Sequence, residues 1–155
     1  MARIRVGPLS IDLVDAQPYS WTRSSYYDPT SYEYSLDMAI DRLVRIYENQ
    51  DMNALESLVQ QGTDVNIQSE TGDNYMLSSD DFHDLMLDNM STTRTQQFAI
   101  VQVQKFRAGA RVRAIHTFTD PNGNTAQLQH VYTLEQDEHG YYIAALRVTR
   151  GSTSF

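Results

Sequence analysis

The stretch that decides the fold is residues 110–149, with the sequence ARVRAIHTFTDPNGNTAQLQHVYTLEQDEHGYYIAALRVT. Apolar and polar residues alternate along three parts of it, which is the period of a β-strand with one buried face. The parts are separated by Pro121-Asn122-Gly123-Asn124 and by His139-Gly140. Short turns of this kind between alternating segments are strong signals of β-hairpins. With one more alternating segment ahead of them, the predicted strands are 95–106, 110–119, 125–136 and 141–149.

The chain ahead of these strands has the 3.6-residue period of amphipathic helices. We expect Ser35 to cap a first helix, Asp51 to cap a second that ends at Gly62, and Ser78 or Ser79 to cap a third. Val65 and Ile67 predict a short strand between the second and third helices. Helices followed by an antiparallel meander predict an α+β domain.

Residues 1–34 do not fit this plan and are expected to form an extended N-terminal arm. Alternation in 3–14 is broken by Pro8, and the following segment is rich in aromatic residues that include Trp21, Tyr26 and Tyr27. Three interpretations stay open: packing over the domain, a partner-binding surface, or a lid. Residues 151–155 are predicted to be a C-terminal tail.

Composition excludes several function classes. Cysteine is absent, which removes disulfides, thiolate metal sites and thiol nucleophiles, and the net charge of −8 argues against nucleic-acid binding. No apolar run approaches the ~20 residues of a membrane span, and the N-terminus lacks the apolar core of a signal peptide. We expect a chain that is not inserted in a membrane, and its compartment stays open.

The charge is divided unevenly along the chain. Residues 35–90 hold two basic and twelve acidic side chains, whereas residues 91–155 hold seven basic and four acidic ones. One interpretation is solvated helix faces beside a polar sheet face. The other is docking between regions of complementary charge, within the chain or between subunits.

The order of elements resembles the nuclear transport factor 2-like superfamily, and most closely its SnoaL-like and ketosteroid-isomerase-like cone. The stretches that carry the resemblance are Ile40–Val59, Val65–Ile67, Ser78–Met90 and Thr117–Val148. The resemblance spans residues 35–150 and implies three helices packed on a strongly bent antiparallel sheet, a cone-shaped α+β barrel. It also implies a homodimer through the polar outer sheet face, where Arg111 and Arg113 lie. The superfamily includes enzymes and noncatalytic binders, so the fold does not choose between them.

Alternation predicts which strand residues face the helices. In 110–119 and 125–136 the even-numbered residues form the inner face, which places His116 and His130 together on one hairpin with Tyr132 nearby. The hairpin register stays open: paired numbers that sum to 246 set the histidines opposite each other, and a sum of 244 sets them diagonally. In the last strand we expect Tyr142, Ala144, Leu146 and Val148 to face inward.

These residues define the candidate sites. The predicted ligand-binding residues are His116, Phe118, Leu128, His130, Tyr132 and Tyr142. The catalytic candidates are His116, His130 and Tyr132, because imidazole titrates near neutrality. The predicted interface residues are Trp21, Tyr26, Tyr27, Arg111 and Arg113. No cofactor and no metal is expected, since two histidines lack a third ligand.

Three functions follow as hypotheses. The first is a noncatalytic domain that binds a small hydrophobic ligand or a protein, because the inner strand positions offer no carboxylate base. The second is a cofactor-independent isomerase or lyase that uses His116 and His130; Asp84 or Asp88 would then have to supply the carboxylate. The third is an accessory subunit that docks through the arm.

Overall fold

The computed structural model of the protein describes residues 17–21 and 32–150. The predicted strand at 3–14, the aromatic residues Tyr26 and Tyr27, and the tail at 151–155 lie outside the described residues. The domain boundaries and the accessory-subunit hypothesis, which depend on these parts, therefore stay predictions.

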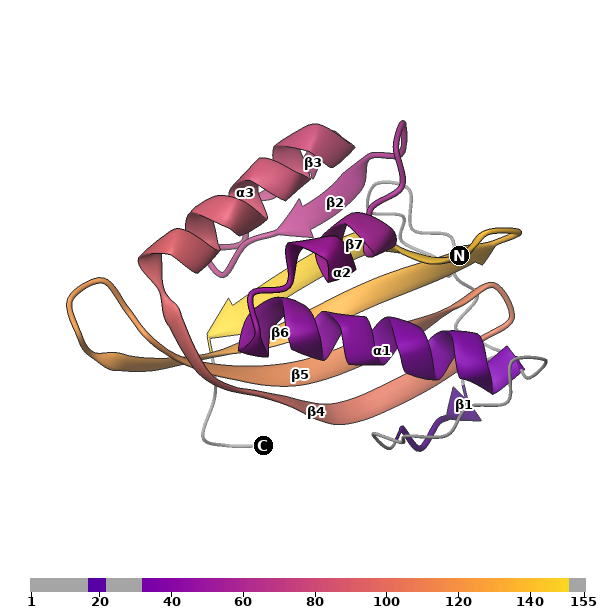
Figure 1. The fold of residues 1–155 in the computed structure, drawn as a ribbon, viewed down its shortest axis with the longest axis horizontal. Helices are drawn as coiled ribbons and strands as arrows, with labels where there is room; N and C mark the ends of the chain where they lie inside the picture. Colours follow the sequence, from indigo (N-terminus) through magenta and orange to yellow (C-terminus); the bar gives the residue numbers. More distant parts are fainter. Residues whose placement is uncertain (1–16, 22–31, 151–155) are drawn as a thin grey trace.

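The described residues form three helices and one curled, unclosed sheet (Figure 1). The helices are α1 (Tyr32–Glu48), α2 (Met52–Leu58) and α3 (Ser79–Thr92). The strands are β1 (Gln17–Pro18), β2 (Val65–Gln68), β3 (Asn74–Leu77), β4 (Arg94–Phe106), β5 (Gly109–Thr119), β6 (Thr125–Asp137) and β7 (Gly140–Arg150). Their order across the sheet is β1-β4-β5-β6-β7-β2-β3, and the β4–β7 meander is antiparallel as predicted.

The α+β class is confirmed, but the sheet is mixed rather than antiparallel throughout. β2 lies beside β7 and runs parallel to it, and β3 pairs with β2 in an antiparallel hairpin. The sequence did not predict β3, because three of its four residues are exposed and its pattern carries no buried face. β3 is held by backbone pairing with β2 at the edge of the sheet. The alternation of apolar and polar residues detects only strands that have a buried face.

Two predicted helix limits were wrong and two were right. α1 begins at Tyr32, so Ser35 lies inside the helix rather than at its cap. α2 ends at Leu58, and Gly62 (φ +81°) lies beyond it, in a turn closed by Thr63 N donating to Gln60 O. Asp51 caps α2 by accepting from Ala54 N at 3.1 Å, and Ser78 caps α3 by accepting from Asp81 N at 3.1 Å.

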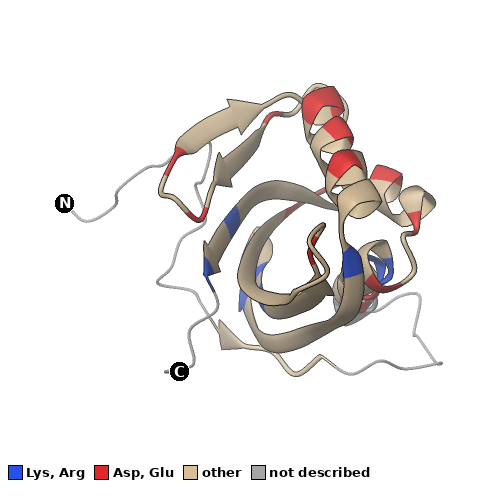
Figure 2. Cartoon of the chain, turned by 90° about the vertical axis from the view of Figure 1, so that its left-hand side faces the viewer, with Lys and Arg blue, Asp and Glu red and all other residues tan. Residues whose placement is uncertain are grey.

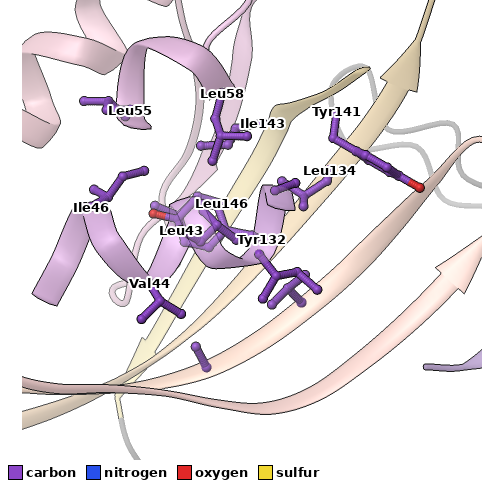
Figure 3. Close-up of a cluster of buried hydrophobic side chains, with 14 of the residues drawn as sticks. Leu43, Val44, Ile46, Leu55, Leu58, Tyr132, Leu134, Tyr141, Ile143 and Leu146 are labelled. Atoms are coloured by element: carbon purple, nitrogen blue, oxygen red, sulfur yellow. The ribbon is translucent and has the colours of Figure 1, made fainter. Parts of the chain in front are cut away.

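The core fills one end of the curled sheet. α1 lies across the concave face, and its apolar side meets α2 and the strands (Figure 3). The largest fully buried side chains in this cluster include Leu43, Ile46, Leu55, Leu58, Tyr132, Leu134 and Ile143. A buried leucine or isoleucine contributes about 1.5–3 kcal/mol relative to an exposed one, so this end is closed by packing.

The β5–β6 loop decides how the two histidines lie. Asp120 N donates to Asn124 O at 2.8 Å, and Asp120 Oδ1 accepts from the backbone N–H groups of Asn122 and Asn124. This five-residue loop pairs His116 with Leu128 and Ala114 with His130, which is the register with a sum of 244. The histidines are therefore diagonal neighbours on the inner face.

A bulge in β7 reverses one predicted face. Thr133 pairs with Ala145, but Leu134 pairs with Ile143, so β7 holds one extra residue between them. Beyond the bulge Ile143 faces inward, whereas Tyr142 pairs with Glu135 on the outer face and donates a 3.1 Å hydrogen bond to its Oε1. The prediction that Tyr142 faces the helices was wrong, because the extra residue Ala144 breaks the alternation between the two parts of β7.

The described part of the aromatic segment packs on the domain. Tyr19 N donates to Val103 O on β4, and Tyr19 Oη donates to Asp37 Oδ1 at 2.7 Å. Trp21 Nε1 reaches Asp37 O on α1 at 3.4 Å. These contacts favour the packing interpretation for this short stretch. A partner interface at Trp21 stays a prediction.

Acidic and basic side chains lie in different parts of the structure. Figure 2 shows acidic positions along α3 and at the β2–β3 hairpin, and basic positions on strands of the curled sheet. Among the described helices, none has the length and apolar character needed to cross a bilayer.

Candidate functional site

A cavity of about 260 Å³ opens at the end of the sheet that the core leaves unfilled. α3 and the β2–β3 hairpin form one side of it, and the C-terminal end of α1 and strands β4 to β7 form the other. Most of its lining is apolar, with Leu85, Met86, Met90, Leu128 and Val148 among the contributors.

Four of the predicted ligand-binding residues line this cavity. They are His116, Phe118, Leu128 and His130. Tyr132 lies below it, fully buried against Tyr47, and Tyr142 lies on the opposite face of the sheet. The prediction of two inner histidines beside a tyrosine is thus met by the geometry, although the tyrosine at the cavity surface is Tyr47.

Several lining residues were not predicted as site residues. Tyr47, Met86 and Met90 have the apolar spacing of helix faces that pack in a core, which does not distinguish them from other core residues. Tyr75 and Glu70 come from the β2–β3 hairpin, whose second strand the pattern does not reveal. A hydroxyl at the last apolar position of α1, Tyr47, is the one signal that could have identified part of this group.

A chain of buried polar atoms lies under the cavity. The hydroxyls of Tyr47 and Tyr132 are 2.5 Å apart, and Tyr47 Oη is 3.4 Å from His130 Nδ1. Tyr132 has no other hydrogen-bond partner among the described residues, so its proton is satisfied only if it donates to Tyr47. Tyr47 Oη then has two acceptors in reach, Met86 Sδ at 3.9 Å and His130 Nδ1 at 3.4 Å; donation to His130 places the proton of the neutral ring on Nε2. That Nε2 has no partner in the described part of the chain.

Aromatic rings hold these groups in place. The Tyr47 ring stacks on Phe98 with centroids 4.2 Å apart and an angle of 3°, and His116 stacks on Phe118 at 4.7 Å. The two imidazoles meet edge to face at 5.3 Å. His116 Nε2 is also hydrogen-bonded to Thr95 Oγ1 at 2.8 Å. Both histidines are therefore fixed by a ring on one side and a hydroxyl on the other.

Burial keeps the site uncharged. It lowers the pKa of His116 to about 4, and burial followed by the neighbouring His116 lowers the pKa of His130 to about 3. Burial also raises the pKa of Tyr47 and Tyr132 well above that of a free phenol. At pH 7 the polar groups are neutral imidazoles and neutral phenols, because apolar surroundings disfavour the charged form of each.

The carboxylates lie at the mouth or outside. Glu70 is the one acidic residue among the described lining residues; it is exposed, and its Oε1 lies 3.9 Å from Arg150 Nη2. Asp84 and Asp88 are exposed on α3 and are not part of the lining. In the described ranges, no three histidine, aspartate or glutamate side chains gather closely enough to hold a metal ion.

Removing the hydroxyl of Tyr47 alone is expected to destabilise the protein by more than half of what removing both tyrosine hydroxyls does. Tyr47→Phe leaves the buried Tyr132 hydroxyl without its partner, and we expect the free energy of unfolding to fall by about 1–3 kcal/mol. The double variant Tyr47→Phe/Tyr132→Phe removes both polar groups, so its loss should be smaller than the sum of the single losses. Urea unfolding of the three variants measures this. Strictly additive losses would contradict the hydrogen bond.

No family model and no curated protein matches this chain. Its fold, however, is that of several solved structures. A putative calcium/calmodulin-dependent kinase II association domain from Exiguobacterium sibiricum matches with a TM-score of 0.61 and 13% identity, over 83% of this chain and 100% of that one. A putative isomerase from Rhodopseudomonas palustris matches with a TM-score of 0.60 and 11% identity, over 77% and 90%.

A third match names the fold. It is a hypothetical protein with a ketosteroid isomerase-like fold from Catenulispora acidiphila, in complex with trimethylamine, with a TM-score of 0.57 and 8% identity over 75% of this chain and 87% of that one. The chain therefore has the cone fold of the nuclear transport factor 2-like superfamily, as its sequence pattern predicts. At these identities the likeness concerns the fold alone.

Proposed function

We propose that this protein binds a small, uncharged, mostly apolar ligand in the cavity under α3, without transforming it. The observation that carries the proposal is a largely apolar lining over two imidazoles that are neutral at pH 7, with the acidic Glu70 at the mouth. A charged ligand would lose its hydration there and find no counter-charge at the floor. At about 260 Å³ the cavity lies just below the usual ~300–1,000 Å³ of drug-sized sites, so the ligand is small.

The polar groups suit recognition by hydrogen bonding. The lining includes Thr95, Asn89 and the two imidazoles, which offer neutral donors and acceptors in a setting otherwise made of carbon. A ligand with one carbonyl or hydroxyl group would satisfy some of them and be oriented by them. Ligand sites in proteins commonly combine apolar walls with a few placed polar groups in this way.

The isomerase or lyase hypothesis receives less support. A general base works best with a pKa near the working pH, and imidazoles with pKa values of about 4 and 3 are weak bases at pH 7. Glu70 is the alternative base within the described lining, but it is exposed at the mouth. The similarity to a putative isomerase does not supply the missing group.

The proposal is tested by narrowing the cavity from the sheet side. Val148 lines the cavity, and Thr149, the next residue of β7, faces outward. We expect Val148→Trp to weaken binding of the uncharged dye N-phenyl-1-naphthylamine at least tenfold, because the indole occupies ligand space. The matched control Thr149→Trp should bind like the unmodified protein. Dye fluorescence in a titration measures both.

A second pair of variants, on α3, tests the proposal independently in case Val148→Trp does not fold. Leu85 lines the cavity from α3, whereas Leu87 is 41% exposed on the same helix. Leu85→Trp should weaken dye binding and Leu87→Trp should not. If the unmodified protein does not bind the dye, or if all four variants bind it equally, the cavity is not a ligand site.

A further inference from the structure

The outer face of the sheet holds a second hollow, separate from the cavity under α3. It has a volume of about 190 Å³, and its walls come from β5, β6, β7 and β2. Three arginines surround it: Arg111 and Arg113 on β5 and Arg147 on β7. The two sites lie on opposite faces of the same strands, and β7 residue Leu146 contributes to both.

Strand register explains why the arginines form a hollow. Arg113, Val131 and Arg147 lie in one row across β5, β6 and β7, and Arg111 pairs with Thr133 in the adjacent row. Neighbouring strands are about 4.8 Å apart, so the two β5 arginines flank the small β6 residues from one side and Arg147 flanks them from the other. Long side chains thus stand around a floor of short ones, and Asn66 and Gln68 of β2 add polar groups.

The arginines lack an ion-pair partner within the described residues. None of the three forms an ion pair with a carboxylate there, and the buried Nε of Arg113 has no hydrogen-bond acceptor. Glu135 lies on the same face but does not line the hollow; its Oε1 accepts from Tyr142, and its buried Oε2 has no hydrogen-bond partner among the described residues. Burial, then Arg147 and Arg113, lower the pKa of Arg111, as expected for cations held near one another. The arrangement is costly to the folded protein unless an anion joins it.

We propose that this hollow binds a phosphate group, carried either by inorganic phosphate or by a small phosphate monoester. Guanidinium is planar and presents N–H donors in a fork that matches phosphate oxygens, and three of them suit a dianion better than a singly charged carboxylate. A two-fold interface centred on this patch would instead set each cationic cluster against its copy. The geometry therefore fits a small anion better than a second copy of the chain.

The test is a titration of the full chain with inorganic phosphate at constant ionic strength. Cross-peaks of the arginine Nε–Hε groups in NMR spectra of ¹⁵N-labelled protein report binding at each arginine. We expect saturable shifts at Arg113 and at least a tenfold weaker affinity in Arg113→Gln and in Arg147→Gln. Arg94→Gln is the matched control, because Arg94 is exposed at the start of β4 and does not line the hollow. Its affinity should be unchanged.

Stability provides a second readout that a purely structural role would not reproduce. Without phosphate, Arg147→Gln should raise the midpoint of thermal unfolding, because it relieves repulsion with Arg111. With saturating phosphate the order should reverse, since the unmodified protein gains more from binding. Arg147 is exposed, so its replacement leaves the packed floor intact.

Titrations with phenyl phosphate and with benzoate identify the chemical group that the hollow binds. Phenyl phosphate that binds more tightly than inorganic phosphate would assign the site to a phosphate monoester, and equal binding would assign it to the phosphate group alone. Benzoate that binds as tightly as phenyl phosphate would overturn the proposal in favour of a carboxylate. The absence of saturable shifts, or equal affinity in the Arg113→Gln and Arg147→Gln variants and the unmodified chain, would also overturn it.

Discussion

Lowering the pH from 7 to 5 is expected to reduce the free energy of unfolding by about 4 kcal/mol, or about 2 kcal/mol for each buried histidine. In the folded protein the pKa values of His116 and His130 are about 4 and 3, below the ~6.5 of an unfolded chain. Both states are largely neutral at pH 7. At pH 5 the unfolded chain has bound two protons that the folded protein excludes, so the equilibrium moves toward unfolding. The loss begins near pH 6.5 and continues to about pH 3.

Urea unfolding at several pH values measures this dependence. The groups that face the two imidazoles from α1, β4 and β6 are the uncharged Tyr47, Thr95 and Tyr132, and no carboxylate of the described residues is among the causes of their pKa shifts. His116→Gln/His130→Asn removes both titrations while keeping a polar atom near each bonded nitrogen. Its stability should change much less between pH 7 and pH 5. A double variant whose stability changes with pH as steeply as that of the parent would show that these two imidazoles are not the cause.

Replacing Phe98 by alanine is expected to cost about 3–5 kcal/mol, the range for truncating a buried phenylalanine. Phe98 is 2% exposed and forms the stacked partner of Tyr47. Its ring also contacts both histidines, with centroids 5.8 Å from each. Removal therefore opens space beside the polar chain as well as in the core. Chemical unfolding at pH 7 measures the loss.

Val101 on the same strand provides the control. It is 52% exposed, so Val101→Ala should change stability by less than about 0.5 kcal/mol. Phe98→Ala should also let water approach His130 and raise its pKa toward the ordinary value, which NMR titration of the imidazole would detect. A small loss in Phe98→Ala, equal to that in Val101→Ala, would contradict the packing described for the site.

The site residues on the inner face of β5 and β6 could be predicted from the alternation of apolar and polar residues. His116, His130 and Leu128 occupy even positions of two strands with alternating sequences, and the pairing of β5 with β6 runs from Gly109 to Thr119 without a register shift. Tyr142 escaped the same reasoning because the β7 bulge adds one residue, and nothing in an alternation pattern marks where a bulge occurs. The cover formed by α3 and the β2–β3 hairpin also escaped it, since an edge hairpin with exposed side chains has no hydrophobic period.

The amino-acid sequence alone determined the α+β class, the caps Asp51 and Ser78, the four meander strands, and the presence of two histidines on one inner face. Each of these depends on residues close together in the chain, where period and turn chemistry act. Only the tertiary structure decided the diagonal register of the histidines, their hydrogen-bonded neighbours Tyr47 and Thr95, and the position of β2 beside β7. The register follows from the length of the β5–β6 loop, which the alternation pattern left open. The other two depend on contacts between residues far apart in the sequence, whose free energies no local pattern contains. The neutral cavity and the arginine hollow on the opposite face are products of that packing.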